Sequence, residues 1–215
     1  KLNQAISAAN SAKSTPNYTE ADSGQQKALD DALSEAEKAK NSNDPSAVGK
    51  ATTDLQAAQS GLNGDSKLAT AKDQADQNIG QMTNLSDDQK KAAKDKINSA
   101  KTSSDVQQAE SDADNLGKLN QAISAANSAK STPNYTEADS GQQKALDDAL
   151  SEAEKAKNSN DPSAVGKATT DLQAAQSGLN GDSKLATAKD QADQNIGQMT
   201  NLSDDQKKAA KDKIT

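Results

Sequence analysis

The chain contains no cysteine, histidine, arginine, phenylalanine or tryptophan, and its only aromatic residues are Tyr18 and Tyr135. Without cysteine there is neither a disulfide framework nor a thiolate metal site. Without histidine, the usual general base and the commonest transition-metal ligand are missing. All 25 cationic residues are lysine, so no guanidinium can clamp a phosphate or carboxylate with two hydrogen bonds. These absences argue against catalysis, a metal centre and a bound cofactor.

Apolar residues are scarce as well. Only 31% of the residues are hydrophobic, and no apolar run approaches the roughly 20 residues of a transmembrane helix, so we expect no membrane insertion. The net charge of −7 with scattered lysines lacks the concentrated basic patch that nucleic acid requires. Low hydrophobicity can indicate disorder, but the abundant Ala, Lys, Glu, Gln and Asp at helical spacing favour slender helical bundles with thin cores.

The sequence is a tandem repeat. Residues 118–214 repeat residues 1–97 without a difference, and residues 98–117 occur once. A repeat of this length should contain one or two complete small folds. The sequence starts and stops within a unit, so we expect the natural protein to continue on both sides.

Within each unit, apolar residues recur at spacings of three and four, as on one face of a helix. The clearest stripe covers residues 48–62 and follows Asp44 and Pro45, which suit an N-cap and a first helical position. Ser86 and Gln89 have the spacing of a capping box. Each unit therefore holds five or six helices, which predicts an all-α fold of three-helix bundles.

Two segments indicate connections between helices. Pro16 and its turn-forming neighbours predict a loop over residues 14–24. The segment KTSSD predicts a short turn in which Ser103 or Ser104 caps the next helix.

The seam between the two copies decides how the bundles are joined. Past Leu116 and Gly117, the apolar stripe resumes at Leu119 and Ile123 with neither proline nor a turn cluster between them. A strict spacing of three and four would place the next apolar residue at 120, but it lies at 119. The apolar stripe is therefore rotated around the helix axis, so that the helix segment before the seam can pack in one bundle and the segment after it in the next. Gly117 could instead end a helix as its C′ residue. Because a mid-helix glycine costs only about 1 kcal/mol, we predict one helix over residues 104–130.

Together these patterns predict tandem three-helix bundles joined end to end through a shared long helix, in an elongated, monomeric rod. We expect bundles at residues 1–63, 64–117, 118–180 and 181–215. The last is incomplete, because the segment that supplies the third helix at 104–117 occurs once.

Two kinds of module resemble known families. PNYTEADSGQQKALDDALSEAEKAK with NDPSAVGKATTDLQAAQSGLNG resembles the FIVAR module, and DSKLATAKDQADQNIGQMTNLSDDQKKAAKDKINSAKTSSDVQQAESDADNL resembles the GA-like module. Their alternation covers essentially the whole chain and resembles the repeats of giant staphylococcal surface proteins. The resemblance implies a non-catalytic, cell-wall-associated protein on the surface of a Gram-positive bacterium. It also implies attachment to fibronectin or another host matrix protein.

Albumin binding, a property of some GA modules, is not expected here. That activity uses aromatic and aliphatic residues around the second helix of the module. The matching segment, residues 85–100, has no aromatic residue and carries several lysines. It therefore offers neither the aromatic nor the arginine anchors that usually dominate an interface.

Two features are candidate ligand contacts. Tyr18 and its copy Tyr135 could anchor a host protein, although an aromatic ring that folds back onto an alanine-rich core is the commoner arrangement. Lys90, Lys91 and Lys94 could bind an acidic polymer, although with interleaved aspartates they also suit an ordinary solvated helix face.

Three functions compete. The chain could be an adhesin whose many weak repeats act together, a structural spacer or envelope-stabilising stalk with no host ligand in these repeats, or a reversible membrane-surface protein. Weak apolar faces and net acidity disfavour the third. We conclude that the sequence encodes a surface rod module with matrix attachment as its inferred activity, and the spacer as the alternative.

Overall fold

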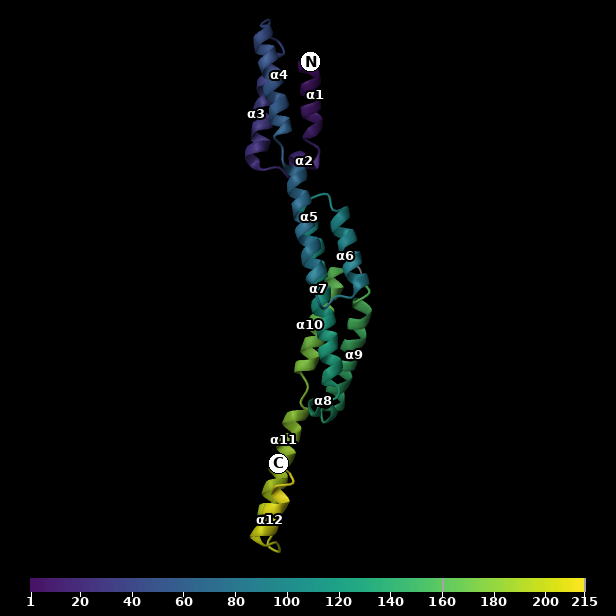
Figure 1. Cartoon of the computed structure of the whole chain (residues 1–215). Coiled ribbons are helices and arrows are strands. Elements are labelled where there is room, and N and C mark those ends of the chain that lie inside the picture. Colours follow the sequence, from purple (N-terminus) through teal and green to yellow (C-terminus); the bar gives the residue numbers. More distant parts are fainter. Residues whose placement is uncertain (160, 215) are drawn as a thin grey trace. The chain divides into compact units, whose positions relative to one another are not determined.

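The computed structural model describes residues 1–159 and 161–214, and every regular element within them is a helix (Figure 1). The chain divides into two compact units, Lys1–Ala113 and Asp114–Thr215. Unit 1 holds two successive three-helix bundles, and unit 2 holds one complete bundle and a helical hairpin. The predicted all-α fold of tandem bundles is confirmed.

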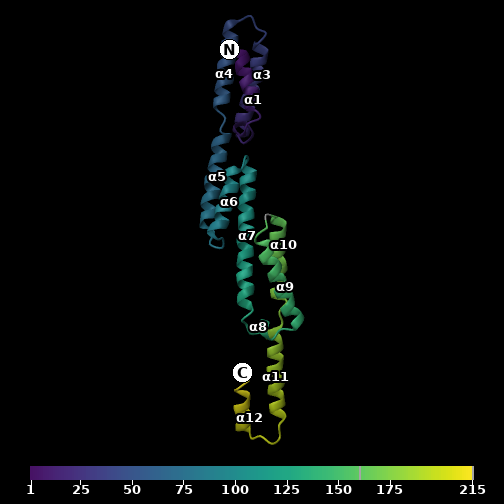
Figure 2. The same cartoon turned by 90° about the vertical axis from the view of Figure 1, so that its right-hand side faces the viewer.

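The first bundle of unit 1 packs three helices around a thin aliphatic core (Figure 2). Its helices are α1 (Leu2–Ala12), α3 (Ser23–Ala39) and α4 (Pro45–Ser60), and the one-turn helix α2 (Pro16–Thr19) connects α1 to α3. The core consists of small and medium aliphatic side chains: Leu2, Ala5, Ile6, Ala9, Ala21, Leu29, Ala36, Ala51, Leu55 and Leu62. Because many of these are alanine, each helix contributes only a narrow buried stripe.

The second bundle of unit 1 is built from α5, α6 and the first part of α7. These helices span Gly64–Gln81, Asp87–Ser99 and Ser103–Ala129. Their buried apolar side chains are Leu68, Ala75, Ile79, Leu85, Ala93, Ile97, Ala100, Val106, Ala109 and Ala113. A hydrogen bond of 2.6 Å from Asn78 Nδ2 to Glu110 Oε1 links α5 to α7 at the edge of this core.

Local capping explains where the helices begin. The Asp44 carboxylate accepts a hydrogen bond from the Ser46 N–H at 2.9 Å, and Ser86 forms the predicted capping box at the start of α6. The start of α7 differs from the prediction. Thr102, rather than Ser103 or Ser104, exchanges hydrogen bonds with Asp105: Asp105 N–H donates to Thr102 Oγ1, and Thr102 N–H donates to Asp105 Oδ2, both at 3.1 Å.

The predicted loop over residues 14–24 was also partly wrong. It contains α2, because Pro16 takes the first helical position, where its missing N–H costs nothing. Gln26 Nε2 then donates to the carbonyl oxygen of Tyr18 at 2.8 Å. The same oxygen also accepts from the Ala21 N–H at 3.1 Å, and the Gln26 side chain thereby ties the end of α2 to α3.

Helix α7 passes through the sequence seam without a break, as predicted. It runs from Ser103 to Ala129, and Lys118 at the seam forms an ion pair of 2.7 Å with Asp114 one turn earlier. The buried residues before the seam, at 106, 109 and 113, and after it, at 119, 122, 123 and 126, lie on different faces of the helix. One helix thus carries two core faces.

Unit 2 begins within α7 and repeats the first bundle. Its further helices are α8 (Pro133–Thr136), α9 (Ser140–Ala156) and α10 (Pro162–Ser177). Leu119, Leu146 and Leu172 are fully buried in its core. The α7 segment therefore takes the place that α1 has in unit 1.

The hairpin of α11 (Gly181–Gln198) and α12 (Asp204–Lys211) completes unit 2. Its sequence matches residues 64–94, whose apolar stripe is buried in unit 1, yet Leu185, Ile196 and Leu202 are only half-buried here. Met199 is 45% exposed. The described residues of unit 2 offer this hairpin no third helix, because the α7 N-terminal sequence occurs once in the chain.

We predict that Lys118→Pro disrupts α7 at the seam. Proline removes the hydrogen bond to the carbonyl of Asp114 and clashes with it, at a cost of about 3 kcal/mol or more within a helix. Amide hydrogen exchange over residues 114–122 should accelerate while the fully buried Leu29 region keeps its protection. Lys118→Ala, which removes the same ion pair, is the control and should leave the exchange nearly unchanged. Unaltered exchange in Lys118→Pro would contradict a continuous helix.

Candidate functional site

Within the described residues, no three acidic, histidine or cysteine side chains gather closely enough to hold a metal ion. None of the helices in that part of the chain combines the length and the apolar character needed to cross a bilayer.

Tyr18 lies half-buried against the first core, and its hydroxyl donates to Asp30 Oδ2 at 2.9 Å. Lys13 Nζ pairs with Asp30 Oδ1 at 2.8 Å and lies 5.5 Å from the centre of the tyrosine ring. The hydrogen bond to Asp30 raises the pKa of Tyr18, and the hydrogen bond from Lys13 lowers the pKa of Asp30. Tyr135 repeats these contacts with Asp147 and Lys130. Both tyrosines are thus engaged within their own bundle.

The three candidate lysines of α6 also have partners within the chain. Lys90 Nζ donates to the carbonyl oxygen of Gly80 at 3.1 Å. Lys91 pairs with Asp95 at 2.8 Å, and Lys94 pairs with Asp76 at 2.7 Å. The structure does not bring them together around one cleft: Lys90 and Lys94 contact α5, whereas Lys91 pairs within α6.

The residues predicted for the shared helix differ in their burial. Leu119 and Ile123 belong to the core of the unit 2 bundle. Gly117 is buried and Leu116 is half-buried. All four lie within α7.

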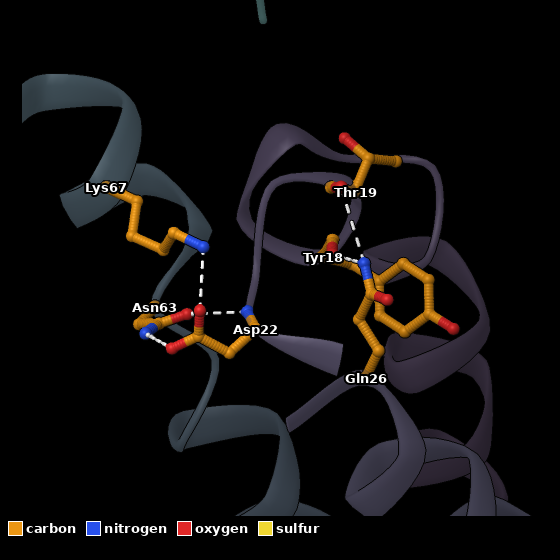
Figure 3. Close-up of polar contacts among 6 residues, drawn as sticks. All are labelled: Tyr18, Thr19, Asp22, Gln26, Asn63 and Lys67. Carbon is orange, nitrogen blue, oxygen red and sulfur yellow. Dashed lines mark hydrogen bonds and ion pairs between the residues drawn. The ribbon is translucent and has the colours of Figure 1, made fainter. Parts of the chain in front are cut away.

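The most specific polar site of unit 1 was not found from the sequence: it is the contact between α2 and the start of α5 (Figure 3). We call it the α2–α5 joint and define it by Asn17, Asp22, Asn63, Gly64 and Lys67. It connects the first bundle to the second. Sequence patterns assigned Asn63 and Gly64 to the end of a helix, whereas Gly64 is the first residue of α5.

Asp22 is the centre of this joint (Figure 3). Its backbone N–H donates to Asn63 Oδ1 at 3.1 Å, and its carboxylate accepts from Asn63 Nδ2 at 2.7 Å. The second carboxylate oxygen pairs with Lys67 Nζ at 2.7 Å. One aspartate therefore holds both amide atoms of Asn63 and the lysine one turn further along α5.

Gly64 permits the backbones of α2 and α5 to approach. A Cβ atom built on Gly64 would lie 2.5 Å from the Asn17 carbonyl oxygen and still closer to that of Pro16. Beside this contact, the Asp65 N–H donates to Asn17 Oδ1 at 3.1 Å. The start of α5 thus obtains a hydrogen-bond acceptor from α2 for one of its open N–H groups.

A further bond ties α2 to α7. The backbone N–H of Ser103, at the start of α7, donates to Glu20 Oε2 at 2.9 Å. A carboxylate at a helix N-terminus is favoured both by the open N–H groups and by the helix dipole. The segment from α2 to Asp22 therefore contacts two helices of the second bundle: α7 through Glu20, and α5 through the joint.

Unit 2 repeats the joint without this last bond. Asp139 contacts Asn180 and Lys184 as Asp22 contacts Asn63 and Lys67, and a Cβ on Gly181 would strike the carbonyl oxygens of Pro133 and Asn134. Ser103, which bonds to Glu20, belongs to the segment 98–117, which occurs only once in the sequence. Glu137 is accordingly exposed where Glu20 is half-buried.

The pKa values of Asp22, in the joint, and of the neighbouring Glu20 are both lowered. Hydrogen bonds from Lys67 and then from Asn63 hold the pKa of Asp22 below its ordinary value. Ser103 lowers the pKa of Glu20 through hydrogen bonds from its hydroxyl and backbone N–H. Both groups therefore favour the closed joint when they are ionised.

We predict that Gly64→Ala opens the joint, because either α2 or α5 must move to make room for the new methyl group. Overpacking of this kind costs about 1–3 kcal/mol, and the Asp22 and Asp65 amides should exchange faster. Gly49→Ala is the matched control: a Cβ there meets open space within α4, so it should stabilise the protein by about 1 kcal/mol. Equal effects of the two substitutions on the joint amides would contradict the steric argument.

We predict that acid opens the joint. A carboxyl group whose pKa is lowered in the closed state stabilises that state above its ordinary pKa of about 4. It loses this contribution as the pH falls through the lowered value. Amide exchange of Asp22 and Ser103, followed between neutral pH and pH values below the ordinary carboxyl range, should show progressive opening after correction for intrinsic rates. Asp22→Asn combined with Glu20→Gln should flatten this dependence.

The model of the FIVAR domain matches residues 1–63 and 115–180, and the model of the GA module matches residues 65–122 and 182–215. The α2–α5 joint thus lies where a FIVAR match gives way to a GA match.

Curated relatives and a solved structure cover the whole chain. The extracellular matrix-binding protein ebh of Staphylococcus aureus (strain MRSA252) is 34% identical over 227 residues, which cover 99% of this chain and 2% of the relative. EbhA of strain Newman is also 34% identical, over 99% of this chain and 7% of the relative. This chain therefore spans only a small part of these relatives.

The crystal structure of an EbhA domain from Staphylococcus aureus superposes with a TM-score of 0.68 at 29% identity, covering 99% of this chain and 90% of that one. A second Staphylococcus aureus domain, described as similar to streptococcal adhesins, has a TM-score of 0.50 at 30% identity and covers 54% of this chain and 94% of its own. The predicted resemblance is confirmed: the chain belongs to the FIVAR family, as a non-enzymatic repeat segment in which FIVAR domains alternate with GA modules.

Proposed function

We propose that this chain is a repeat segment of a bacterial cell-surface adhesin, which projects from the cell wall as a monomeric rod and attaches to host extracellular matrix through many weak contacts. Fibronectin is the ligand that the family resemblance implies. The relatives of this chain are named extracellular matrix-binding proteins, which supports a matrix ligand. We further propose structural modules at 1–63, 64–117, 118–180 and 181–215.

The proposal of a rod is supported mainly by the absence of flexible linkers among the described residues. Neither the boundary between successive repeats nor the boundary between the two bundles of one repeat contains such a linker. Between repeats, α7 continues from one bundle into the next. Between α4 and α5 only Gly61, Leu62 and Asn63 intervene, and Leu62 is buried in the first core. Both features favour a chain whose modules keep their spacing, as a projecting stalk requires.

Weak contacts per repeat are the more plausible route to attachment, because the candidate contact residues are already engaged. Tyr18, Lys91 and Lys94 each have a partner within the chain. A ligand would have to replace those partners, which lowers the net gain per site. Linked repeats compensate through effective concentration. We therefore retain Tyr18, Tyr135, Lys90, Lys91 and Lys94 as candidate contacts.

The contacts that these side chains make within the chain also support the alternative, a structural spacer or envelope-stabilising stalk with no host ligand in these repeats. A spacer needs solvated surfaces and fixed module lengths, and it needs no anchor residue. The two functions predict different behaviour when the number of repeats changes.

We predict that binding to immobilised fibronectin rises more steeply than in proportion to repeat number. Proteins of one, two and four 117-residue repeats should be compared at equal repeat concentration, with solution scattering to confirm that maximum dimension grows linearly. Slower dissociation of the longer arrays is the expected sign of multivalency. Lys91→Ala with Lys94→Ala in every repeat tests the lysine face, and Lys27→Ala in every repeat is the control for loss of an exposed ion pair.

The outcomes separate the hypotheses. If four repeats bind no better than one, the multivalent adhesin is wrong. If no array binds while scattering still shows linear growth, only the spacer remains. A maximum dimension that stops growing with repeat number would contradict the rod itself.

A further inference from the structure

An asparagine followed by glycine occurs at only two places in the sequence, Asn63–Gly64 and Asn180–Gly181. Both lie at the start of a helix in the joint between bundles. This dipeptide is chemically labile, because a following glycine has no side chain to hinder attack of its backbone nitrogen on the asparagine side chain. The position of the two dipeptides therefore matters for the chemistry of the joint.

The joint requires both members of the dipeptide. Gly64 is needed because any Cβ would collide with the carbonyl oxygens of Pro16 and Asn17. Asn63 is needed because its side chain both accepts from the Asp22 N–H and donates to the Asp22 carboxylate. An aspartate side chain could accept but not donate, so this contact requires the labile Asn–Gly sequence.

The closed joint blocks the reaction. For Gly64 N to reach Cγ of Asn63, the side chain must rotate away from Asp22 and break both hydrogen bonds. The backbone on either side is also held: Lys67 N–H donates to the Asn63 carbonyl at 2.9 Å, and Asp65 N–H donates to Asn17 Oδ1. The reaction therefore needs a local opening, and its rate should follow the open population.

We propose that Asn63 and Asn180 are deamidation sites that the closed joint protects and that opening exposes, so that opening becomes irreversible. In the open joint, Gly64 N loses its proton to water and bonds to Asn63 Cγ, and the side-chain nitrogen leaves as ammonia. Water then adds to either carbonyl of the resulting succinimide and breaks one of its C–N bonds. The products are aspartate or isoaspartate at position 63, with no oxidant or reductant required.

The product cannot re-form the joint. The amide donor to Asp22 is lost, and a new carboxylate would face the Asp22 carboxylate at hydrogen-bond distance. Like charges this close disfavour the ionised pair, and Lys67 would have to serve both. A joint that has been open for long enough near neutral pH would thus remain open.

The two sites differ in their surroundings and not in their local sequence, which provides an internal comparison. Within the described residues, helix α11 lacks the third helix with which α5 packs, and its apolar residues are less buried. Residues 1–97 and 118–214 are identical, so the intrinsic reactivity of the two dipeptides is the same. The first joint has the additional Glu20–Ser103 bond, and the second does not. Asn180 should consequently react faster than Asn63 in the folded protein.

Lys67 does not provide a competing route. Its ammonium could form an amide with Asn63 only as an uncharged nucleophile, which proteins obtain by burying the lysine. Lys67 and Asp22 are instead 46% and 59% exposed, in an ion pair. Loss of one ammonia that persists after mild alkaline treatment would reveal such an amide, because a succinimide would hydrolyse, and would overturn the proposal.

The test is to incubate the full 215-residue chain near neutral pH and to quantify aspartate and isoaspartate at both sites by peptide mass spectrometry. Cleavage after lysine gives the identical peptide 51–67 and 168–184 from the two copies. Thr53→Ser, at an exposed position that keeps its hydroxyl bond to Gly49, marks the first copy by mass. The same chain in urea gives the unprotected rate.

We expect both sites to react more slowly in the folded chain than in urea, and Asn180 to react about three- to tenfold faster than Asn63, the range expected for one hydrogen bond to a carboxylate in a partly exposed site. Glu20→Ala should raise the Asn63 rate toward that of Asn180, and Glu137→Ala, its matched control, should leave Asn180 unchanged. Asp22→Ala should bring Asn63 close to the urea rate. Equal rates in folded and unfolded chains, or an Asn63 rate insensitive to Glu20→Ala and Asp22→Ala, would overturn the proposal.

Discussion

The close approach of two backbones at Gly64 is the contact on which the organisation of each repeat depends. Because no side chain separates α2 from α5 there, the polar groups of Asn17, Asp22 and Asn63 come within hydrogen-bonding distance. The three-residue connection between α4 and α5 contains Leu62, which is part of the first core. A boundary that would otherwise be a linker is therefore an interface, with steric, polar and apolar components that reinforce one another.

The second kind of boundary has a different physical basis. At the seam between copies the connection is the hydrogen-bonded backbone of α7 itself. Breaking it requires unfolding a helix whose buried faces serve as core, whereas opening the α2–α5 joint requires only the loss of contacts among residues that, apart from Gly64, are exposed or half-buried. The joint should consequently be the softer of the two along the chain. The free energy of such a local opening lies at the low end of the range of opening free energies found within a protein.

The sequence was sufficient for features that depend on near neighbours. Asp44 with Pro45, the Ser86 capping box and the absence of proline or a turn cluster around Gly117 all act within one or two helical turns, so their patterns are visible in the chain. The joint was missed because its partners lie 41 to 48 residues apart. Asn63 and Gly64 also resemble a helix end in isolation. Even at short range, the choice of Thr102 over Ser103 as cap depended on the side-chain position of Asp105, which no spacing rule specifies.

The two copies show that the boundaries of the repeated sequence differ from the boundaries of the folded bundles. Residues 65–94 and 182–211 are identical, and both form a hairpin whose capping box and cross-helix ion pair, Lys94–Asp76 or Lys211–Asp193, are intact. Only the first hairpin buries its apolar stripe, because only it is packed with the N-terminal part of α7. Local interactions thus specify the helices, while burial requires a segment from beyond the repeated sequence. In an array, each α7-type helix completes the bundle before the seam and begins the bundle after it. Any ligand affinity that grows with length should therefore be counted per completed bundle, not per copy of the repeat.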